Sequence, residues 1–289
     1  MPSFGKSDKP ASPACFSIFR RSLGFSQNLI SLCGAVLPAH AAIESDTVGY
    51  TTTQIQGTDA NDNVKWYLIG VQFKEVNGEA DQIKLGEAIL LNGIDAWSGK
   101  WRDRSKGPML EVYNGTGYDI YYFVSAELSG TGSAAWMNDS QQDASNVYLH
   151  PGEAFWFCDK ALGTATGSLV VKGGVKTGAT ATVDIDANTL QTGTNPFPMS
   201  VKIKDIGCSL TPFSGKWRNR ATGIILEVWN GTGYDMYYYV SADLSGTESA
   251  AWVDDNQSVA TAELPAGGAF WLKTTGETGT LTFSYSQSN

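Results

Sequence analysis

Residues 97–136 read WSGKWRDRSKGPMLEVYNGTGYDIYYFVSAELSGTGSAAW, and residues 213–252 repeat this stretch as FSGKWRNRATGIILEVWNGTGYDMYYYVSADLSGTESAAW. The two segments align without a gap at an offset of 116 residues, and 29 of the 40 positions are identical. Self-similarity over such a long period indicates copies of a whole domain, because the turns of a solenoid repeat at much shorter intervals. The sequence therefore predicts two copies of one domain in tandem.

The centre of each copy has the pattern of a β-hairpin. In the first copy the β-rich run 110–113 leads into Asn114-Gly115-Thr116-Gly117, and a second β-rich run follows at 118–124. Asn-Gly between two such runs favours a tight turn, because both residues tolerate positive φ. The second copy repeats the pattern at 226–240.

Outside the hairpins, short runs of Val, Ile, Thr and aromatic residues alternate with turn residues, which is typical of antiparallel strands. Helical periodicity is confined to 81–92 and predicts one or two helical turns there. We therefore predict an all-β protein with two tandem β-sandwich or jelly-roll-like domains, at 42–173 and 174–289, related by internal duplication.

The first 41 residues have the composition of a secretory signal peptide. Four basic residues, Lys6, Lys9, Arg20 and Arg21, precede an apolar stretch at 29–37, and Ala39-His40-Ala41 supplies small residues for cleavage. We predict that 1–41 is such a signal and that the protein is secreted, to the extracellular space or cell surface, with the periplasm as an alternative. We expect no membrane insertion after cleavage, because the apolar stretch is far shorter than a membrane span.

Charge argues against nucleic-acid partners. The full chain has a net charge of −9, and without residues 1–41 it has a net charge of −12. A nucleic-acid groove needs clustered Lys and Arg to displace counterions, and no such cluster remains. We therefore expect no nucleic-acid partner.

Two cysteines, Cys158 and Cys208, lie beyond the predicted signal. In an oxidising compartment they are candidates for a disulfide that joins the two domains. The alternative is that each is a separate, small buried hydrophobic residue. The sequence leaves both interpretations open.

The inventory of catalytic residues is poor. His150 is the only histidine after the predicted signal, and its place before Pro151-Gly152 indicates a turn residue. Glu111 with Asp119, repeated as Glu227 with Asp235, could form carboxylate pairs for glycoside hydrolysis. A solvated hairpin face explains the same carboxylates, so we predict no catalytic residues and no enzymatic activity.

Two acidic runs place oxygen ligands at alternate positions, as a calcium site would. The candidate metal ligands are Asp59, Asn61, Asn63, Asp184 and Asp186. Neither run has the glycine or the final glutamate of an EF-hand loop, and Asp and Asn are common turn residues. We expect no cofactor, with calcium as the alternative.

Aromatic side chains occur on both faces of the expected strand at 118–124. A strand with one solvated face should alternate apolar and polar residues, so either both faces are buried or one face meets a ligand or another subunit. Aromatic rings stack on the apolar faces of sugar rings. The ligand-binding candidates are therefore Tyr121, Phe123, Tyr237, Tyr239, Asp119 and Asp235, with core packing as the alternative.

Four motifs follow residue 41: an early V-G-Y strand at 48–50, a W-x-L-I or N-P-F-P strand at 66–69 and 195–198, the N-G-x-G-Y hairpin, and a P-G-x-A-F-W strand at 151–156. With these motifs the chain resembles secreted, largely uncharacterised β-rich repeat proteins of planctomycete–verrucomicrobial type bacteria. The resemblance implies export and a β architecture, and it implies no activity.

These observations favour a non-catalytic, secreted or cell-envelope-associated structural or interaction protein. A tandem carbohydrate-binding module is the first alternative, and a glycan-active hydrolase is the second. The expected partners are an extracellular glycan, another envelope protein or a second copy of the chain.

Overall fold

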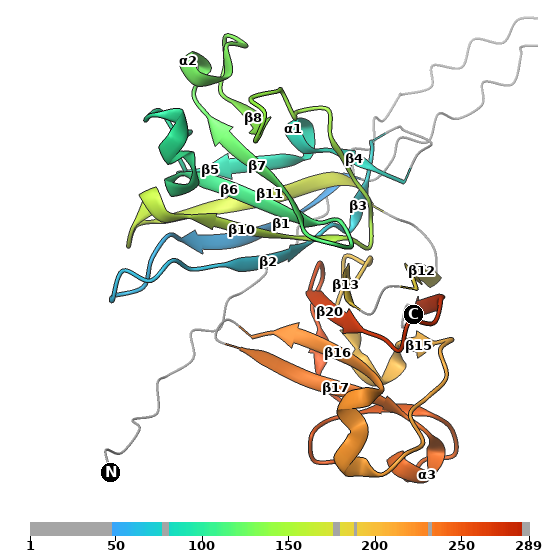
Figure 1. Ribbon diagram of the computed structural model, residues 1–289. Helices are drawn as coiled ribbons and strands as arrows, with labels where there is room; N and C mark the ends of the chain where they lie inside the picture. Colours follow the sequence, from blue (N-terminus) through green and yellow to red (C-terminus); the bar gives the residue numbers. More distant parts are fainter. Residues whose placement is uncertain (1–47, 77–80, 176–179, 188–189, 231–232, 285–289) are drawn as a thin grey trace, which may run out of the picture.

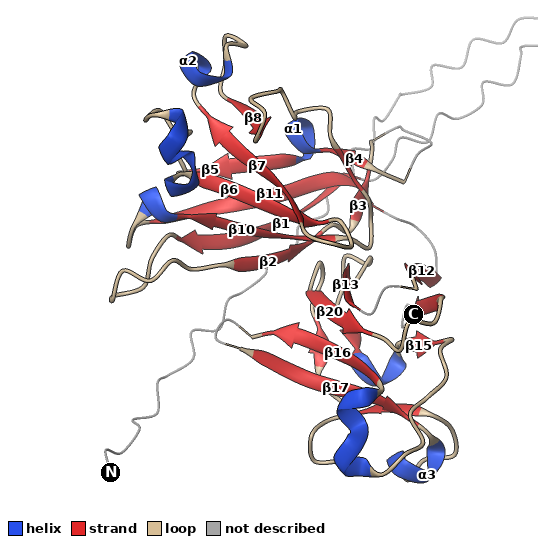
Figure 2. Ribbon diagram, in the orientation of Figure 1, coloured by secondary structure: helices blue, strands red, loops and turns tan. Residues whose placement is uncertain are grey.

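The computed structural model describes residues 48–76, 81–175, 180–187, 190–230 and 233–284, which form short antiparallel strands and a few short helices (Figures 1 and 2). The predicted all-β class is confirmed. The predicted secretory signal at 1–41 lies outside the described residues. Within them, every helix is too short or too polar to cross a membrane.

We call residues 48–175 the N-terminal half. Its elements are β1 (Val48–Gln56), β2 (Tyr67–Gly70), β3 (Phe73–Lys74), β4 (Ile83–Lys84), α1 (Leu85–Ala88), β5 (Ile89–Asn92), η1 (Trp101–Lys106), β6 (Pro108–Tyr113), β7 (Tyr118–Val124), α2 (Ala126–Ser129), β8 (Ala135–Asn138), β9 (Tyr148–Leu149), β10 (Ala154–Asp159), η2 (Lys160–Leu162) and β11 (Thr166–Val175). Two sheets enclose its core. One has the order β1-β11-β3, with β5 also paired to β11, and the other has the order β2-β10-β6-β7-β8. β4 and β9 form a separate two-stranded ribbon.

We call residues 180–284 the C-terminal half. Its elements are β12 (Thr180–Ile185), β13 (Leu190–Thr194), β14 (Val201–Lys202), η3 (Ile203–Asp205), β15 (Gly207–Cys208), η4 (Trp217–Thr222), β16 (Ile224–Trp229), β17 (Tyr234–Val240), α3 (Ala242–Ser245), β18 (Ala251–Val253), β19 (Glu263–Leu264), β20 (Ala269–Lys273) and β21 (Gly279–Ser284). A five-stranded sheet of order β13-β20-β16-β17-β18 faces a smaller one of order β12-β21-β15, and β14 pairs with β19.

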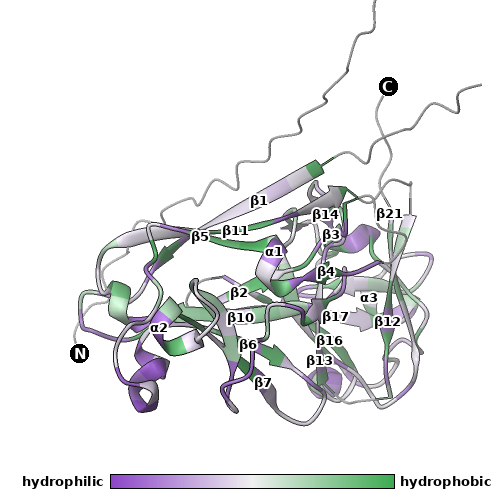
Figure 3. Ribbon diagram, turned by 90° about the horizontal axis from the view of Figure 1, so that it is seen from above, coloured by the Kyte–Doolittle hydropathy of each residue, from purple (hydrophilic) through white to green (hydrophobic). Residues whose placement is uncertain are grey.

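Each half has its own hydrophobic core, to which both of its larger sheets contribute. In the N-terminal half Ile55 and Leu169 come from one sheet, and Leu110 and Phe155 come from the other. In the C-terminal half the side chains of β12 and β21 meet those of β16, β17 and β20. Hydrophobic residues follow the strands, whereas the segments around α2 are strongly hydrophilic (Figure 3).

The two predicted hairpins are present. β6 and β7 pair from Met109↔Tyr122 to Tyr113↔Tyr118, and β16 and β17 pair from Ile224↔Tyr239 to Trp229↔Tyr234. The predicted helix at 81–92 is reduced to the single turn of α1, because the residues on either side pair as strands with β9 and β11.

The boundary expected at Gly173-Gly174 lies inside β11, which ends at Val175. Gly174 pairs with Val48, so the strand continues through the glycines. A Cβ atom on Gly173 would lie only 2.6 Å from the Lys74 carbonyl oxygen, which shows that this glycine allows β3 to approach closely. The transition between the halves therefore follows Val175.

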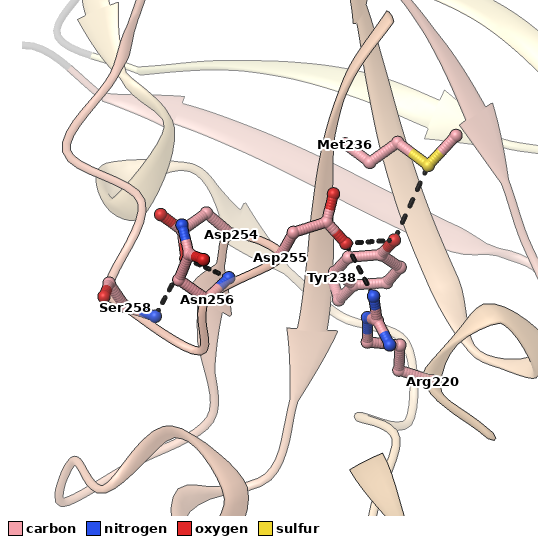
Figure 4. Close-up of polar contacts among 7 residues, drawn as sticks. All are labelled: Arg220, Met236, Tyr238, Asp254, Asp255, Asn256 and Ser258. Carbon is pink, nitrogen blue, oxygen red and sulfur yellow. Dashed lines mark hydrogen bonds and ion pairs between the residues drawn. The ribbon is translucent and has the colours of Figure 1, made fainter. Parts of the chain in front are cut away.

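An arginine joins the 3₁₀ helix of each half to the outer face of its five-stranded sheet. The Arg220 guanidinium lies 4.6 Å from the ring centroid of Trp217 and 4.8 Å from that of Tyr238. Its Nη2 donates to Asp255 at 2.7 Å, and the Tyr238 hydroxyl donates to the same carboxylate at 3.0 Å (Figure 4). Arg104 makes the corresponding contacts in the N-terminal half.

Replacing Arg220 with alanine is expected to lower the free energy of unfolding by about 1–2 kcal/mol, because two cation–π contacts and the packing of the side-chain stem are lost. Guanidinium denaturation of the full chain measures this loss. Arg218→Ala is the matched control, since Arg218 is exposed. An equal loss in both variants would contradict the structural role of Arg220.

Candidate functional site

Four aromatic residues join the two halves. Trp156 of β10 packs edge-on against Trp229 of β16, with ring centroids 5.7 Å apart. Tyr113 of β6 packs edge-on against Trp271 of β20, with centroids 5.2 Å apart. Tyr113 corresponds to Trp229 in the aligned segments. Trp156 corresponds to Trp271 in the strand pairing, where they are opposite the equivalent residues Glu111 and Glu227. The contact is therefore reciprocal, and we call these four residues the seam.

The closing pair of each hairpin extends the seam towards solvent. Tyr118 lies 5.5 Å from Tyr113 between ring centroids, and Tyr234 lies 5.1 Å from Trp229. Each half thus presents a pair of aromatic residues at its hairpin end, and each pair contacts a tryptophan of the other half. Tyr118 keeps 41 % of its surface exposed, so part of this aromatic surface is open to solvent.

Backbone contacts bring the halves closer than side chains would permit. The Gly70 N–H donates to the Gly267 carbonyl oxygen at 3.2 Å. Gly267 has φ +62° and lies against the Gln72 side chain, which is 1 % exposed. Thr192 Oγ1 lies 3.5 Å from the Ala154 carbonyl oxygen, which adds a second polar contact across the seam.

An open cavity of about 390 Å³ lies beside the seam. Its lining comes from both halves and consists of Tyr118, Trp156, Leu190, Glu227, Tyr234 and Trp271. We call it the seam groove. Four of its six lining residues are aromatic, and the single charged one is a carboxylate. Such a surface provides flat apolar faces together with a hydrogen-bond acceptor.

The electrostatic environment of the groove is negative. Desolvation raises the pKa of Tyr118, and the nearby Glu111 carboxylate raises it further. Desolvation also raises the pKa of Tyr234, with a further contribution from Glu227, whereas a hydrogen bond with Trp271 opposes the shift. Desolvation alone raises the pKa of Glu111. Both phenols therefore stay protonated near neutral pH and can donate hydrogen bonds to a ligand.

The aromatic residues that we selected as ligand-binding candidates lie on the other face of the sheet. Tyr121 and Tyr237 are each 8 % exposed and belong to the cores of their halves. Phe123 packs against Trp136, and the Tyr239 hydroxyl donates to the Cys208 carbonyl oxygen. Core packing, the alternative interpretation, describes all four, because this face of the hairpin meets the second sheet.

The hairpin carboxylates do not form facing pairs. Asp119 is opposite Val112 in the register, whereas Glu111 is opposite Ile120, so Glu111 and Asp119 point to opposite faces of the sheet. The Asp119 carboxylate accepts a hydrogen bond from Asn114 Nδ2 at 3.0 Å. Asp235 is bonded in the same way to Asn230 at 2.9 Å. Asp119 and Asp235 therefore stabilise the hairpin turns.

The candidate calcium ligands that the structure describes lie in local turns and on β12. Asp59 Oδ1 accepts hydrogen bonds from the backbone N–H groups of Asn61 and Asn63, at 2.8 and 2.9 Å. Asp186 N donates to Gln191, and Asp184 is an exposed residue of β12. Within the described ranges, no group of three or more His, Cys, Asp and Glu side chains is placed to hold a metal ion. Turn formation accounts for the run at 59–63.

Cys158 and Cys208 are free thiols, so the candidate disulfide is not present. Cys158 lies on β10 of the N-terminal half, and Cys208 lies on β15 of the C-terminal half. Desolvation raises the pKa of Cys158 to about 12 and that of Cys208 to about 11. Both side chains are therefore unreactive thiols near neutral pH.

His150 is an exposed turn residue. Its backbone N–H donates to Glu153 at 2.8 Å, and its Nδ1 lies 3.1 Å from the Asp81 carbonyl oxygen. It does not line the seam groove.

No family model, curated protein or solved structure matches the chain. The seam groove must therefore be interpreted from its own geometry. The sequence did not predict that four aromatic residues lie together in one groove: Tyr118, Tyr234, Trp156 and Trp271. Trp156 and Trp271 end equivalent A-F-W segments of the two copies, but only tertiary packing places both of them in one groove.

Proposed function

We propose that this protein is a secreted, non-catalytic binding protein, built from two copies of one β-sandwich module, that binds glycan chains in the seam groove. The observation that carries this proposal is the aromatic lining of the groove, to which both halves contribute. Tyrosine and tryptophan rings stack on the apolar faces of sugars, while phenol and carboxylate groups bind their hydroxyls.

The duplication is supported by sequence and structure together. The aligned segments contain matching hairpins, matching arginine contacts and matching seam residues. Two sheets contribute to the core of each half, as in a sandwich. The reciprocal seam then produces one shared groove, in place of the two separate sites expected for independent modules.

A binding role is favoured over glycan hydrolysis by the carboxylate geometry. Hydrolysis requires two carboxyl groups that flank one bond from a common cleft. Glu111 and Asp119 lie on opposite faces of the sheet, and Asp119 is engaged in the turn.

Replacing Tyr118 with alanine is expected to weaken glycan binding at least tenfold, because an exposed stacking surface is removed while the fold is retained. Loss of one stacking contact of roughly 1.5 kcal/mol corresponds to about this factor. Affinity electrophoresis against a panel of soluble polysaccharides identifies a ligand, and calorimetry with that ligand measures the change. Tyr234→Ala should have a similar effect.

Tyr148→Ala is the matched control, because Tyr148 is 43 % exposed on β9 and does not line the groove. Unchanged mobility on every glycan would refute the proposal. Release of shorter sugars from a bound glycan by the wild-type chain would refute its non-catalytic part.

A further inference from the structure

Each half places a glutamate beside the tryptophan that it contributes to the groove. Glu227 is directly opposite Trp271 in the pairing of β16 with β20, and Glu111 is opposite Trp156 in the pairing of β6 with β10. Residues opposite each other in an antiparallel pair share one face of the sheet, so each carboxylate lies alongside its tryptophan. Glu227 lines the groove. The charge of Glu111 raises the pKa of Tyr118, which also lines the groove.

These two carboxylates lack the partners that acids in the turns after β8 and β18 have. Asp255 binds Arg220, and Asp139 binds Arg104, although both aspartates are more than half exposed. In contrast, Glu111 and Glu227 are half-buried, and within the described residues neither makes an ion pair or a hydrogen bond. Partial burial removes some of the water that would hydrate each carboxylate, and a cationic group of a ligand can offset that cost.

The remaining walls of the groove suit a cation. Its lining contains four tyrosine and tryptophan rings and no lysine or arginine. The face of such a ring attracts ammonium groups, and the attraction increases when water is excluded. A carboxylate next to aromatic rings thus selects a positive ligand and disfavours a negative one.

We propose that the ligand of the seam groove is a glycan that bears free amino groups, with one ammonium beside Glu227 and another at the Tyr118 end of the groove, within the field of Glu111. This inference rests on the proposed glycan-binding function and narrows it to one ligand class. Acidic polysaccharides should bind poorly, because they would place like charges next to the two glutamates.

The test compares glucosamine, N-acetylglucosamine and glucuronic acid hexamers by calorimetry with the full chain at pH 6. The glucosamine hexamer should bind at least tenfold more tightly than the N-acetylglucosamine hexamer, and the glucuronic acid hexamer should bind most weakly. Glu227→Gln and Glu111→Gln should each reduce the preference for the amino form severalfold, measured as the ratio of the dissociation constants of the two hexamers.

Glu263→Gln is the matched control, because it removes the same charge from an exposed position on β19, outside the groove. Equal effects of Glu263→Gln and Glu227→Gln would show non-specific attraction of a polycation and would overturn the inference. Equal binding of the amino and acetylated hexamers would overturn it too, but would leave glycan binding intact. If no hexamer binds and the polysaccharide panel is also negative, the proposed function itself fails.

Discussion

Replacing Asp159 with threonine is expected to stabilise the N-terminal half by up to about 3 kcal/mol above pH 6, and to change its stability little below pH 4. Asp159 ends β10 and is 2 % exposed. Desolvation raises its pKa from the ordinary value of 3.8 to about 6, with a smaller contribution from the Asp95 charge. The difference between these two pKa values corresponds to roughly 3 kcal/mol.

The direction of the pH effect follows from proton binding. Below about pH 4 the carboxyl is protonated in both the folded and unfolded states, so it does not change the free energy of unfolding with pH. Between about 4 and 6 the unfolded state loses the proton first, and stability therefore falls as pH rises. Above about pH 6 the folded state carries a buried charge, and the full penalty remains.

The C-terminal half shows that a neutral residue can replace this aspartate. Asp159 Oδ1 accepts a hydrogen bond from Ala161 N at 3.1 Å, two residues further along. At the corresponding position Thr274, which is 4 % exposed, accepts one from Gly276 N at 3.2 Å through its hydroxyl. Threonine should therefore keep the local hydrogen bond without the charge.

Guanidinium denaturation at a series of pH values from 3.5 to 8 measures this effect. Asp159→Asn should follow Asp159→Thr in direction, since it also removes the charge. Asp205→Asn is the control, because Asp205 is exposed in η3. If the variants and the wild type lose stability in parallel between pH 4 and 6, a buried Asp159 charge is not the cause.

Replacing Gly70 with alanine is expected to separate the two halves and to reduce glycan binding at least tenfold. A Cβ atom at position 70 would lie 1.7 Å from Thr194 Oγ1 and 2.5 Å from the Gly267 carbonyl oxygen. Rotation of the threonine side chain would move Oγ1 only. Thr194 Cβ, also 2.5 Å away, and the Gly267 carbonyl oxygen belong to the other half and cannot yield without opening the seam. Overpacking of this kind typically costs about 1–3 kcal/mol.

Small-angle scattering should show a larger radius of gyration for Gly70→Ala, and tryptophan emission should shift to the red, because Trp271 is only 6 % exposed in the joined halves. Circular dichroism should stay close to that of the wild type, since each half has its own core. Gly207→Ala is the control: its Cβ would make an ordinary 3.4 Å contact with Thr282. An unchanged radius of gyration for Gly70→Ala would contradict the close approach at the seam.

The sequence predicted the secondary structure that is determined by residues close together in the chain. Asn114-Gly115 specified the first hairpin, and the short β-rich runs specified an all-β class. The expected helix at 81–92 failed over most of its length because Ile89–Asn92 gains more from pairing with β11 than from helical propensity. The domain boundary expected between residues 173 and 174 lies inside β11, where Gly173 allows β3 to approach closely.

The candidate site was harder to predict, because its residues meet only through tertiary structure. Alternation along 118–124 showed two aromatic faces without showing which of them meets the second sheet. We selected the face of Tyr121, which packs into the core, while Tyr118 on the opposite face reaches the groove. The strand register places Glu111 beside Trp156 and on the opposite face from Asp119. From the sequence alone, Glu111 and Asp119 were the expected pair, because they flank the same hairpin.

The reciprocal seam affects the direction in which a sugar chain can bind. A sugar chain has a reducing and a non-reducing end, and most binding clefts distinguish the two. Here each half contributes one tyrosine and one tryptophan to the groove, Tyr118 with Trp156 and Tyr234 with Trp271, so a reversed chain meets similar stacking surfaces. The protein should therefore accept strands of either polarity, which suits attachment to fibres whose chains run in both directions.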